Sequence, residues 1–155
     1  MERVYIESTV PSYLTAKPTE NLIATARQIL TQRWWEEYKN NYELYVSDVV
    51  LLECQKGDPK AAERRIRVMR NIPVLDMTME CSALAEKIFK ELQIPPKASD
   101  DSFHIAIACV HEVDYLLSWN FKHIVNASMI RKLRDILQKT PYRLPHICTP
   151  EELVP

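Results

Sequence analysis

Short apolar runs alternate along the chain with longer segments in which apolar residues recur at helical spacing. The apolar runs predict strands near residues 4–6, 42–47, 73–75, 115–118 and 146–148. The helical spacing predicts helices near residues 19–40, 49–56, 59–70, 78–92, 99–112 and 126–139. Strands that alternate with helices in this way form a parallel sheet covered on both faces. The pattern therefore predicts one doubly wound α/β domain over residues 1–155.

Turn and capping residues mark several boundaries of these elements. Pro11 indicates a turn after the first strand, and Asp48 is suited to cap the short helix that follows the second strand. Gly57 is placed to end that helix. Because it is the only glycine in the chain, a glycine-rich loop for a dinucleotide or a nucleoside triphosphate is excluded.

The composition narrows the class of protein further. The chain is 46% hydrophobic and 26% charged, which excludes disordered and fibrous proteins. Its four cysteines are scattered without a Cys-x-x-Cys pair, which argues against structural zinc and for free thiols. The first residues lack the apolar stretch of a signal peptide, and no run approaches the ~20 apolar residues of a membrane span. We therefore expect a cytoplasmic protein without membrane contact.

The net charge of −1 means that a nucleic acid would have to be held by a local basic patch. The densest basic stretch lies in the helix predicted at residues 59–70 and comprises Lys60, Arg64, Arg65, Arg67 and Arg70. This stretch is either a phosphate-binding face or a structural one, namely a solvated face balanced by Glu63 or a contact between subunits, and we favour the structural interpretation slightly. Trp119 is a candidate for stacking on a base, whereas Trp34 and Trp35 are expected in the core or an interface.

Several acidic residues are predicted at the carboxyl ends of the strands, where open parallel sheets bind ligands. Glu7 directly follows the first strand, and Glu53 interrupts the otherwise apolar run 49–52. Asp100 and Asp101 open an almost wholly apolar helix. Taken singly, Glu7 could be a solvated strand end and Glu53 an exposed helix position. Asp100 and Asp101 could simply be acids that the helix dipole favours in a first helical turn. Together they predict a cluster at one edge of the sheet.

Polar residues around the fourth strand divide between the two edges. Ser118 and Asn120 follow this strand and offer neutral oxygens at the carboxyl edge, although either could simply form a turn. Asp114 precedes the strand, so we expect it at the opposite edge in a structural role. The histidines show no zinc-type spacing with the acids, and they are expected in the core or on the surface: His104, His111, His123 and His146.

Four blocks carry a resemblance to a known family. They are residues 5–14 (YIESTVPSYL), 46–53 (VSDVVLLE), 101–106 (DSFHIA) and 114–124 (DYLLSWNFKHI). In this order they resemble the PIN domain, the nuclease fold of VapC-like toxins and several RNA-processing proteins. The resemblance spans nearly the whole chain. It implies a three-layer α/β/α PIN-like fold with a central, mostly parallel sheet of about five strands.

The acidic cluster of the family carries over by position. Its first acid, usually Asp, matches Glu7; its second matches Glu53; its third matches Asp101. The fourth, often Asp, falls on Asn120, with Ser118 at the usual Ser/Thr position. The resemblance thus implies metal ligands at Glu7, Glu53 and Asp101, and a catalytic part for Asn120. Supporting positions are Ser118, Asp100 and Thr9.

A metal ion explains why such acids could lie together. Three carboxylates about 4 Å apart repel one another by about 4 kcal/mol per pair at an effective dielectric constant of 20. A divalent cation, or protonation of one acid, makes this tolerable. Oxygen ligands favour Mg²⁺ or Mn²⁺. The resemblance then implies a metal-dependent endoribonuclease with RNA as substrate, an antitoxin protein as partner and a homodimeric state.

Two other functions stay open at this point. Glu7 in place of Asp, and Asn120 in place of an acid, favour a catalytically impaired PIN-like domain that acts as an RNA-binding or assembly module. A different doubly wound protein that binds a small acidic ligand or a phosphate at the same edge is the third hypothesis.

Overall fold

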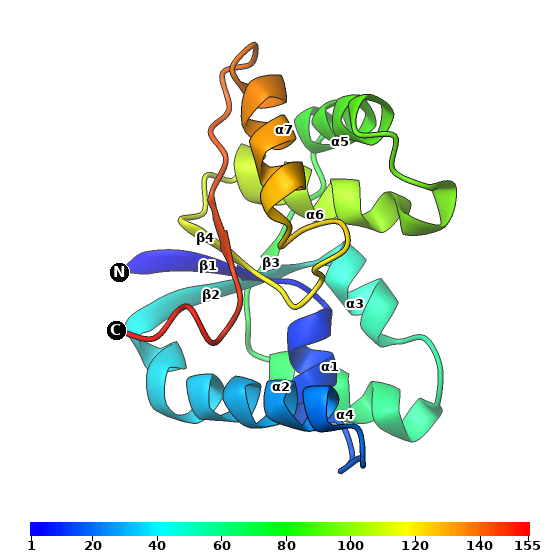
Figure 1. Ribbon diagram of the computed structural model, residues 1–155, viewed down its shortest axis with the longest axis vertical. Helices are drawn as coiled ribbons and strands as arrows, with labels where there is room; N and C mark the ends of the chain where they lie inside the picture. Colours follow the sequence, from blue (N-terminus) through cyan, green and yellow to red (C-terminus); the bar gives the residue numbers. More distant parts are fainter.

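The central sheet has five strands, all parallel (Figure 1). The computed structural model describes residues 1–155. The strands are β1 (Glu2–Ile6), β2 (Tyr42–Ser47), β3 (Val74–Leu75), β4 (Tyr115–Leu117) and β5 (His146–Cys148). Their order is β3-β2-β1-β4-β5, and Val4 of the central strand pairs with Leu44 on one side and Tyr115 on the other. All five predicted strands are therefore confirmed, with bounds within two residues.

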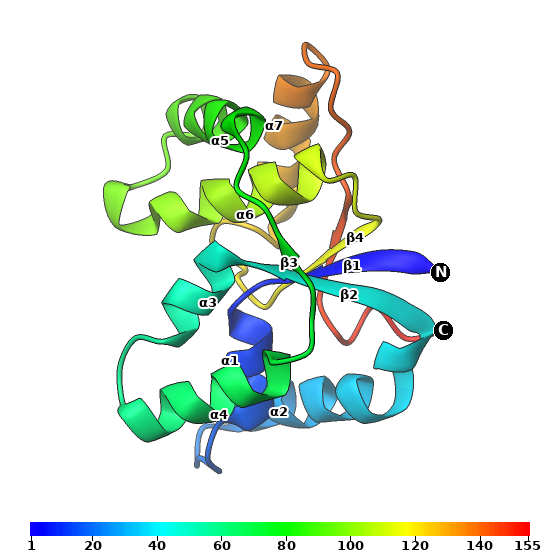
Figure 2. The ribbon, with the colours of Figure 1, turned by 180° about the vertical axis from the view of Figure 1, so that it is seen from behind.

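Helices cover both faces of this sheet and complete a three-layer α/β/α fold. On one face lie α1 (Thr9–Thr15), α2 (Leu22–Arg33) and α4 (Pro59–Met69), and on the other lie α5 (Met79–Glu91), α6 (Ser99–Val110) and α7 (Ala127–Leu137) (Figures 1 and 2). Helix α3 (Asp48–Cys54) lies at the carboxyl end of the strands and contacts both α4 and α6. No helix has the length and apolar character needed to cross a bilayer. The predicted α/β class is confirmed.

Two predicted boundaries after the first two strands were wrong. Pro11 lies within α1 rather than in a turn, because it occupies the first helical turn, where its missing N–H has no intrahelical partner to lose. The N-cap of α3 is Ser47, whose Oγ accepts from the backbone N–H of Val50, and Asp48 is the first helical residue. Gly57 follows α3 with a φ of 85°, the left-handed conformation that ends helices.

The region predicted as one helix over residues 19–40 consists of three helical segments of different type. Helix α2 starts only at Leu22, where the Asn21 side chain accepts from Ala24 N. It then passes into a π-helical segment, Trp34–Tyr38, and a 3₁₀ turn, Lys39–Asn41. The wider π turn changes the register of the side chains, and Trp34 is fully buried as expected for a core residue.

The core brings the first strand and α6 together. Val4, Tyr5 and Ile6 of β1 are fully buried, and every residue of α6 from 104 to 109 is buried. Burial of a large aliphatic side chain contributes about 1.5–3 kcal/mol. This packing places the start of α6 at the same edge as the ends of β1 and β4, which is where the acidic residues lie.

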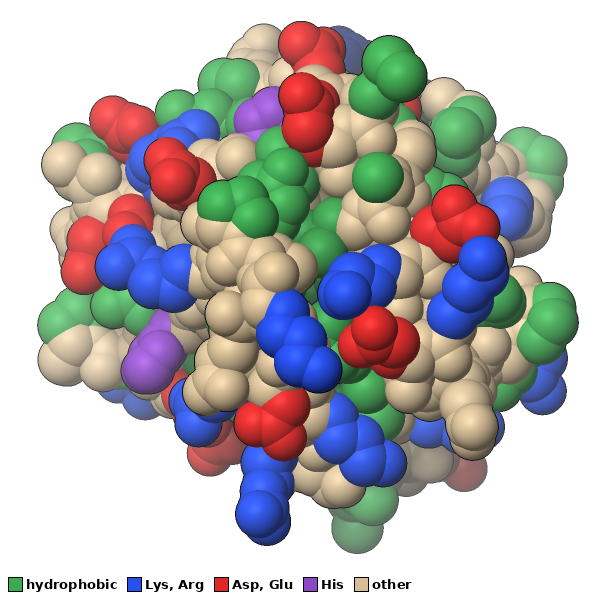
Figure 3. All heavy atoms as spheres, turned by 90° about the horizontal axis from the view of Figure 1, so that it is seen from above, with side chains coloured by type: hydrophobic (Ala, Val, Ile, Leu, Met, Phe, Trp, Pro, Cys, Tyr) green, Lys and Arg blue, Asp and Glu red, His purple; other side chains and the backbone are tan.

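The basic stretch on α4 binds mainly to the protein itself. Arg64 donates to the carbonyl of Thr15 (3.2 Å), Arg65 donates to the carbonyls of Cys54 and Lys56, and Arg67 pairs with Glu63. Arg67 thus matches the solvated face balanced by Glu63 that we favoured, whereas Arg64 and Arg65 bind backbone carbonyls of the protein. Seen from above α5 and α7, the surface also mixes basic and acidic side chains instead of gathering one sign (Figure 3).

Candidate metal centre

The predicted site residues lie where the strand order reverses. After β1 the chain builds β2 and β3 on one side, and it later adds β4 and β5 on the other. Glu7 follows β1, and its N–H donates to the carbonyl of Leu117 at the end of β4 (3.0 Å). Ser118 and Asn120 come next after β4. The expected convergence at the carboxyl edge of the sheet is therefore confirmed for Glu7, Ser118 and Asn120.

Glu7 is buried, with 2% of its surface exposed, and its carboxylate is held by local donors. Its Oε2 accepts from Ser8 Oγ (2.7 Å) and from the backbone N–H of Thr9 (2.9 Å). Its Oε1 accepts from Thr9 Oγ1 (2.6 Å) and from Ser118 Oγ. Because a buried carboxylate is costly unless it is hydrogen-bonded, these donors explain how Glu7 is tolerated there. Thr9 and Ser118, two of the predicted supporting residues, thus contact Glu7.

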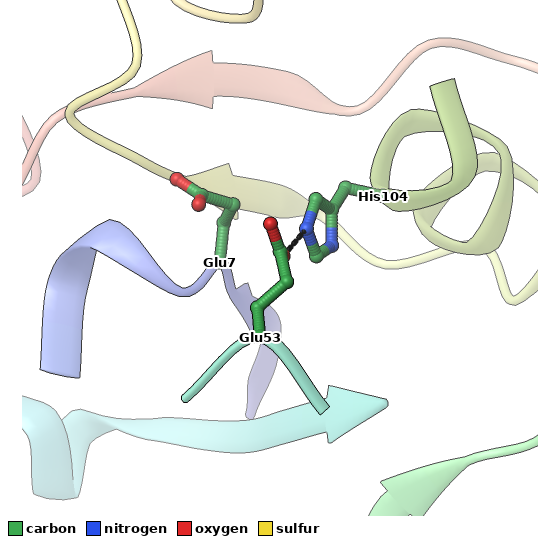
Figure 4. Close-up of side chains that lie close together, drawn as sticks. All are labelled: Glu7, Glu53 and His104. Atoms are coloured by element: carbon green, nitrogen blue, oxygen red, sulfur yellow. Dashed lines mark hydrogen bonds and ion pairs between the residues drawn. The ribbon is translucent and has the colours of Figure 1, made fainter. Parts of the chain in front are cut away.

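Glu53 approaches Glu7 from α3. Its Oε1 accepts from Ser8 Oγ (3.0 Å), so Ser8 bridges the two carboxylates, and the same oxygen contacts Nε2 of His104 (Figure 4). Burial raises the pKa of Glu53, but the hydrogen bond and charge of His104 outweigh this and leave the pKa below its ordinary value. One ligand atom from each of Glu7, Glu53 and His104 lies within 4.8 Å of the others.

His104 is a site residue that the sequence analysis missed. It is fully buried, and its Nδ1 lies 2.7 Å from the Tyr5 hydroxyl, which lies 2.7 Å from Ser47 Oγ. Desolvation lowers its pKa, but the hydrogen bond to Glu53 and the charges of the neighbouring carboxylates raise it above its ordinary value overall. One signal was available: His104 comes three residues after Asp101, which places both on one face of α6.

Asp101 lies beside this group and is held by two other residues. Its Oδ1 accepts from Asn120 Nδ2 (3.1 Å), and its Oδ2 lies 2.8 Å from His123 Nδ1. Burial is the main cause that raises the pKa of Asp101 above its ordinary value, and the negative charge of Glu7 adds to it. Asp101 is not one of the three residues whose ligand atoms lie within 4.8 Å of one another. His123 is the second residue that the sequence analysis missed.

The other residues considered in the sequence, Asp114, Asp100 and Trp119, lie in three different surroundings. Asp114 lies at the opposite edge, where its Oδ2 accepts from the backbone N–H of Arg3 (2.7 Å), as expected of a structural residue. Asp100 is half-buried and lines a cavity with residues of α3. Trp119 is only 5% exposed, and its Nε1 donates to Thr31 Oγ1 (2.8 Å). The expectation that Trp119 could stack on a base was wrong, because its ring is enclosed.

Comparison with known proteins supports the architecture. A chain in the crystal structure of VapBC2 from Rickettsia felis bound to a DNA fragment from their promoter matches this chain with a TM-score of 0.55 and 12% sequence identity. The match covers 95% of this chain and 98% of that chain. The fold is PIN-like. No family model matches the sequence, and no curated protein matches it. At this identity the likeness concerns the fold.

The chemistry of the three-residue group suits a divalent cation. Two carboxylates this close repel each other, and either a bound cation or protonation of His104 relieves that repulsion. The carboxylates match the hard ions Mg²⁺ and Mn²⁺, and an imidazole nitrogen is a good ligand for Mn²⁺ and later transition metals. The donor set therefore fits a bound cation.

The charges of this group predict how stability depends on pH without metal. The raised pKa of His104 stabilises the fold below its ordinary value of 6.5, and this contribution is lost as the pH rises through the folded value. The lowered pKa of Glu53 stabilises the fold above 4.5 and is lost as the pH falls through the folded value.

We therefore expect that, in EDTA, the excess stability of wild type over Glu53→Gln is greatest between about pH 4.5 and 6.5. Urea titrations of both proteins across pH 3–9 would measure this difference. If the stability difference were the same at every pH, the assigned charge pair of Glu53 and His104 would be contradicted. Glu7 and Asp101 add their own negative charges near His104.

Proposed function

We propose that this protein is a metal-dependent endoribonuclease that hydrolyses phosphodiester bonds of RNA. The observation that carries the proposal is the convergence of Glu7, Glu53 and His104 within 4.8 Å at the point where the strand order reverses. Asp101 borders the same group. The PIN-like fold, and the four sequence blocks that resemble PIN domains, support nuclease chemistry at this place.

Glu7, Glu53 and His104 would hold the cation, with Asp101 as an additional ligand. The chemistry that a divalent cation supplies when bound is polarisation of a scissile phosphate and a lower pKa of the attacking water. Thr9 and Ser118 orient the Glu7 carboxylate through their hydroxyl groups. Asn120 and His123 keep Asp101 in place.

Tyr5 makes His104 suitable as a ligand. When Nδ1 carries the proton of the neutral ring, it can donate to the Tyr5 oxygen, which can in turn donate to Ser47 Oγ. The Nε2 lone pair is then free to face a cation, which is the usual arrangement of metal-binding histidines. When Nε2 carries the proton, the same side chain donates to Glu53.

The likeness to a chain of VapBC2 extends the proposal to a biological setting. We propose that the protein is the toxin of a type II toxin–antitoxin pair, with an antitoxin protein as partner and a homodimeric state. Its support is the fold likeness over 95% of the chain, together with the VapC-like sequence blocks. Recovery of a copurifying protein that suppresses RNA cleavage would support this extension, and sedimentation would measure the oligomeric state.

The direct test is cleavage of a mixed, end-labelled RNA pool in Mg²⁺ or Mn²⁺. We expect wild type to cut internally, EDTA to stop cleavage, and Asp101→Asn to lose most of the activity, because this carboxylate borders the proposed centre. Cleavage that resists both EDTA and the substitution would contradict the proposal. A correctly folded wild type that is inactive with both metals at several pH values would favour a non-catalytic role.

That non-catalytic alternative has an observation of its own. Asn120 stands where the family often has an acid, and its amide donates to Asp101 instead of adding a charge. A PIN-like domain with this site could bind RNA or assemble with a partner without cutting.

Replacing Asn120 with Asp separates the two functions. Under the nuclease proposal we expect less than about a tenfold change in cleavage at saturating Mn²⁺, because loss of the Asn120 hydrogen bond to Asp101 offsets the added charge. A gain from no activity to strong cleavage would show that the natural site is impaired. Initial rates on a single-stranded RNA, with matched circular dichroism spectra, would measure the effect.

A further inference from the structure

The chain turns back after α7 and borders a cavity of about 310 Å³ at the end of that helix (Figure 1). Its lining comes from the end of α7 and from the segment that leads into β5: Arg134, Leu137, Gln138, Tyr142, Arg143 and Leu144. Strand β5 begins at His146, which pairs with Tyr115 at the start of β4. The cavity therefore lies toward the amino edge of the sheet, whereas the candidate metal centre lies at the carboxyl edge. We name it the α7 pocket.

The segment that forms the α7 pocket is strongly basic. Residues 131–143 hold five basic side chains and one acidic side chain, a net charge of +4 in a chain whose overall charge is −1. Arg134 and Arg143 line the pocket, and both are exposed. No ion pair within the chain engages either guanidinium, unlike Arg67 on α4, which pairs with Glu63. Both groups therefore keep their donors for a ligand.

The rest of the lining also suits an anion. Gln138 and Tyr142 offer an amide N–H and a hydroxyl, and no carboxylate lines the pocket. The carbonyl of Leu137 at the end of α7 accepts from both the N–H (2.9 Å) and the Oγ1 (2.7 Å) of Thr140. Because these two bonds satisfy that carbonyl, it is not left as a free acceptor facing an anion. The side chains of Leu137, which is buried, and Leu144, which is half-buried, supply apolar surface.

A neighbouring cavity of about 360 Å³ shares Arg143 but differs in charge. It is lined by Glu2 and Asp114, whose carboxylates would repel an anion. Both acids are held by other donors: Asp114 accepts from a backbone N–H of β1 (2.7 Å), and Glu2 accepts from the Tyr115 hydroxyl (3.3 Å). Neither forms an ion pair with Arg143. An anion is therefore favoured in the α7 pocket and not in its neighbour.

We propose that the α7 pocket binds a small phosphate monoester. The phosphate lies at Arg134 and Arg143, and the organic part packs against Leu137, Tyr142 and Leu144. A phosphate monoester carries a charge of about −1.5 to −2 at neutral pH and three acceptor oxygens, which match two guanidinium groups better than the single charge of a carboxylate does. A volume of 310 Å³ is at the lower end of the range for small-molecule sites, which limits the organic part to about the size of a nucleoside.

Titration calorimetry in EDTA, which keeps the candidate metal centre empty of cations, tests the pocket. The probes are inorganic phosphate, adenosine monophosphate and adenosine. We expect the monophosphate to bind severalfold more tightly than phosphate, and adenosine to show no measurable binding. Arg143→Gln should weaken monophosphate binding about tenfold or more, because it removes a charge-assisted contact. The matched control is Arg131→Gln, an exposed arginine of α7 outside the lining, with less than a twofold effect.

Two further measurements define what each side chain does. Tyr142→Phe keeps the ring and removes the hydroxyl, so it should weaken phosphate and the monophosphate by a similar factor. Arg143→Gln should cleave RNA at the wild-type rate if the protein is a nuclease, because Arg143 lies outside the candidate metal centre. The pocket proposal does not depend on the nuclease function, and loss of RNA cleavage in wild type would leave it standing.

Four results would overturn the proposal. Wild type might show no saturable binding of phosphate or the monophosphate at about 1 mM, the upper range of common metabolite affinities. Equal affinity for both would remove the contact with the organic part. Equal losses in Arg131→Gln and Arg143→Gln would mean that the basic face attracts anions without a defined site. A short RNA duplex that binds and is weakened equally by both substitutions would assign the segment to a nucleic-acid backbone.

Discussion

Replacing Glu53 with Gln is expected to lower metal-dependent RNA cleavage by about 10²–10³-fold, the typical effect of removing one electrostatic group from an active site. The carboxylate lies between Glu7 and His104, so its loss removes a ligand from the middle of the proposed centre. The Gln side-chain oxygen can still accept from Ser8 Oγ and from Nε2–H of His104. The fold should therefore be largely retained.

Single-turnover cleavage at increasing Mn²⁺ would measure this loss, with Mn²⁺ affinity from isothermal titration as a second readout. The matched control is Glu63→Gln, because Glu63 is an exposed glutamate that pairs with Arg67 at the surface of α4. Its cleavage rate should equal that of wild type. Full activity and unchanged Mn²⁺ affinity in Glu53→Gln would remove Glu53 from the centre.

Truncating His104 to Ala is expected to destabilise the protein by about 3 kcal/mol, within the range for large buried side chains. His104 is fully buried between Tyr5 and Glu53, so the truncation leaves a cavity and removes one hydrogen-bond partner from each. For a domain of this size the melting temperature should fall by about 6–12 °C. The control is His146→Ala, an exposed position on β5, with an expected change within about 1 kcal/mol.

Mn²⁺ distinguishes a ligand from a purely structural histidine. A cation that binds the folded state raises the melting temperature of wild type. The increase should be smaller in His104→Ala if Nε2 is a ligand. The same increase in both proteins would mean that His104 only supports Glu53, and a melting temperature within 1 °C of wild type would contradict its role in the core.

Local pattern and chain order determined the fold class. The chain alternates apolar runs such as Val4–Ile6 with helical segments. A parallel sheet with helices on both faces buries the apolar runs and the apolar sides of the helices together. Once the strands are parallel, residues that follow them, such as Glu7 and Ser118, must lie at one edge. The sequence missed α1 and the π turn at Trp34–Tyr38, because Pro11 is compatible with either a turn or a first helical turn, and a π turn depends on how Trp34 packs.

Only the tertiary structure decided which side chains meet at that edge. His104 looked like an ordinary core histidine, yet burial of α6 against β1 brings it between Tyr5 and Glu53, which stand 99 and 51 residues away along the chain. The same packing encloses Trp119 and leaves Asp101 against Asn120 and His123. Sequence spacing determines which residues share a helix face or a sheet edge, whereas contacts between elements depend on how the whole core packs, and that packing assembled the centre.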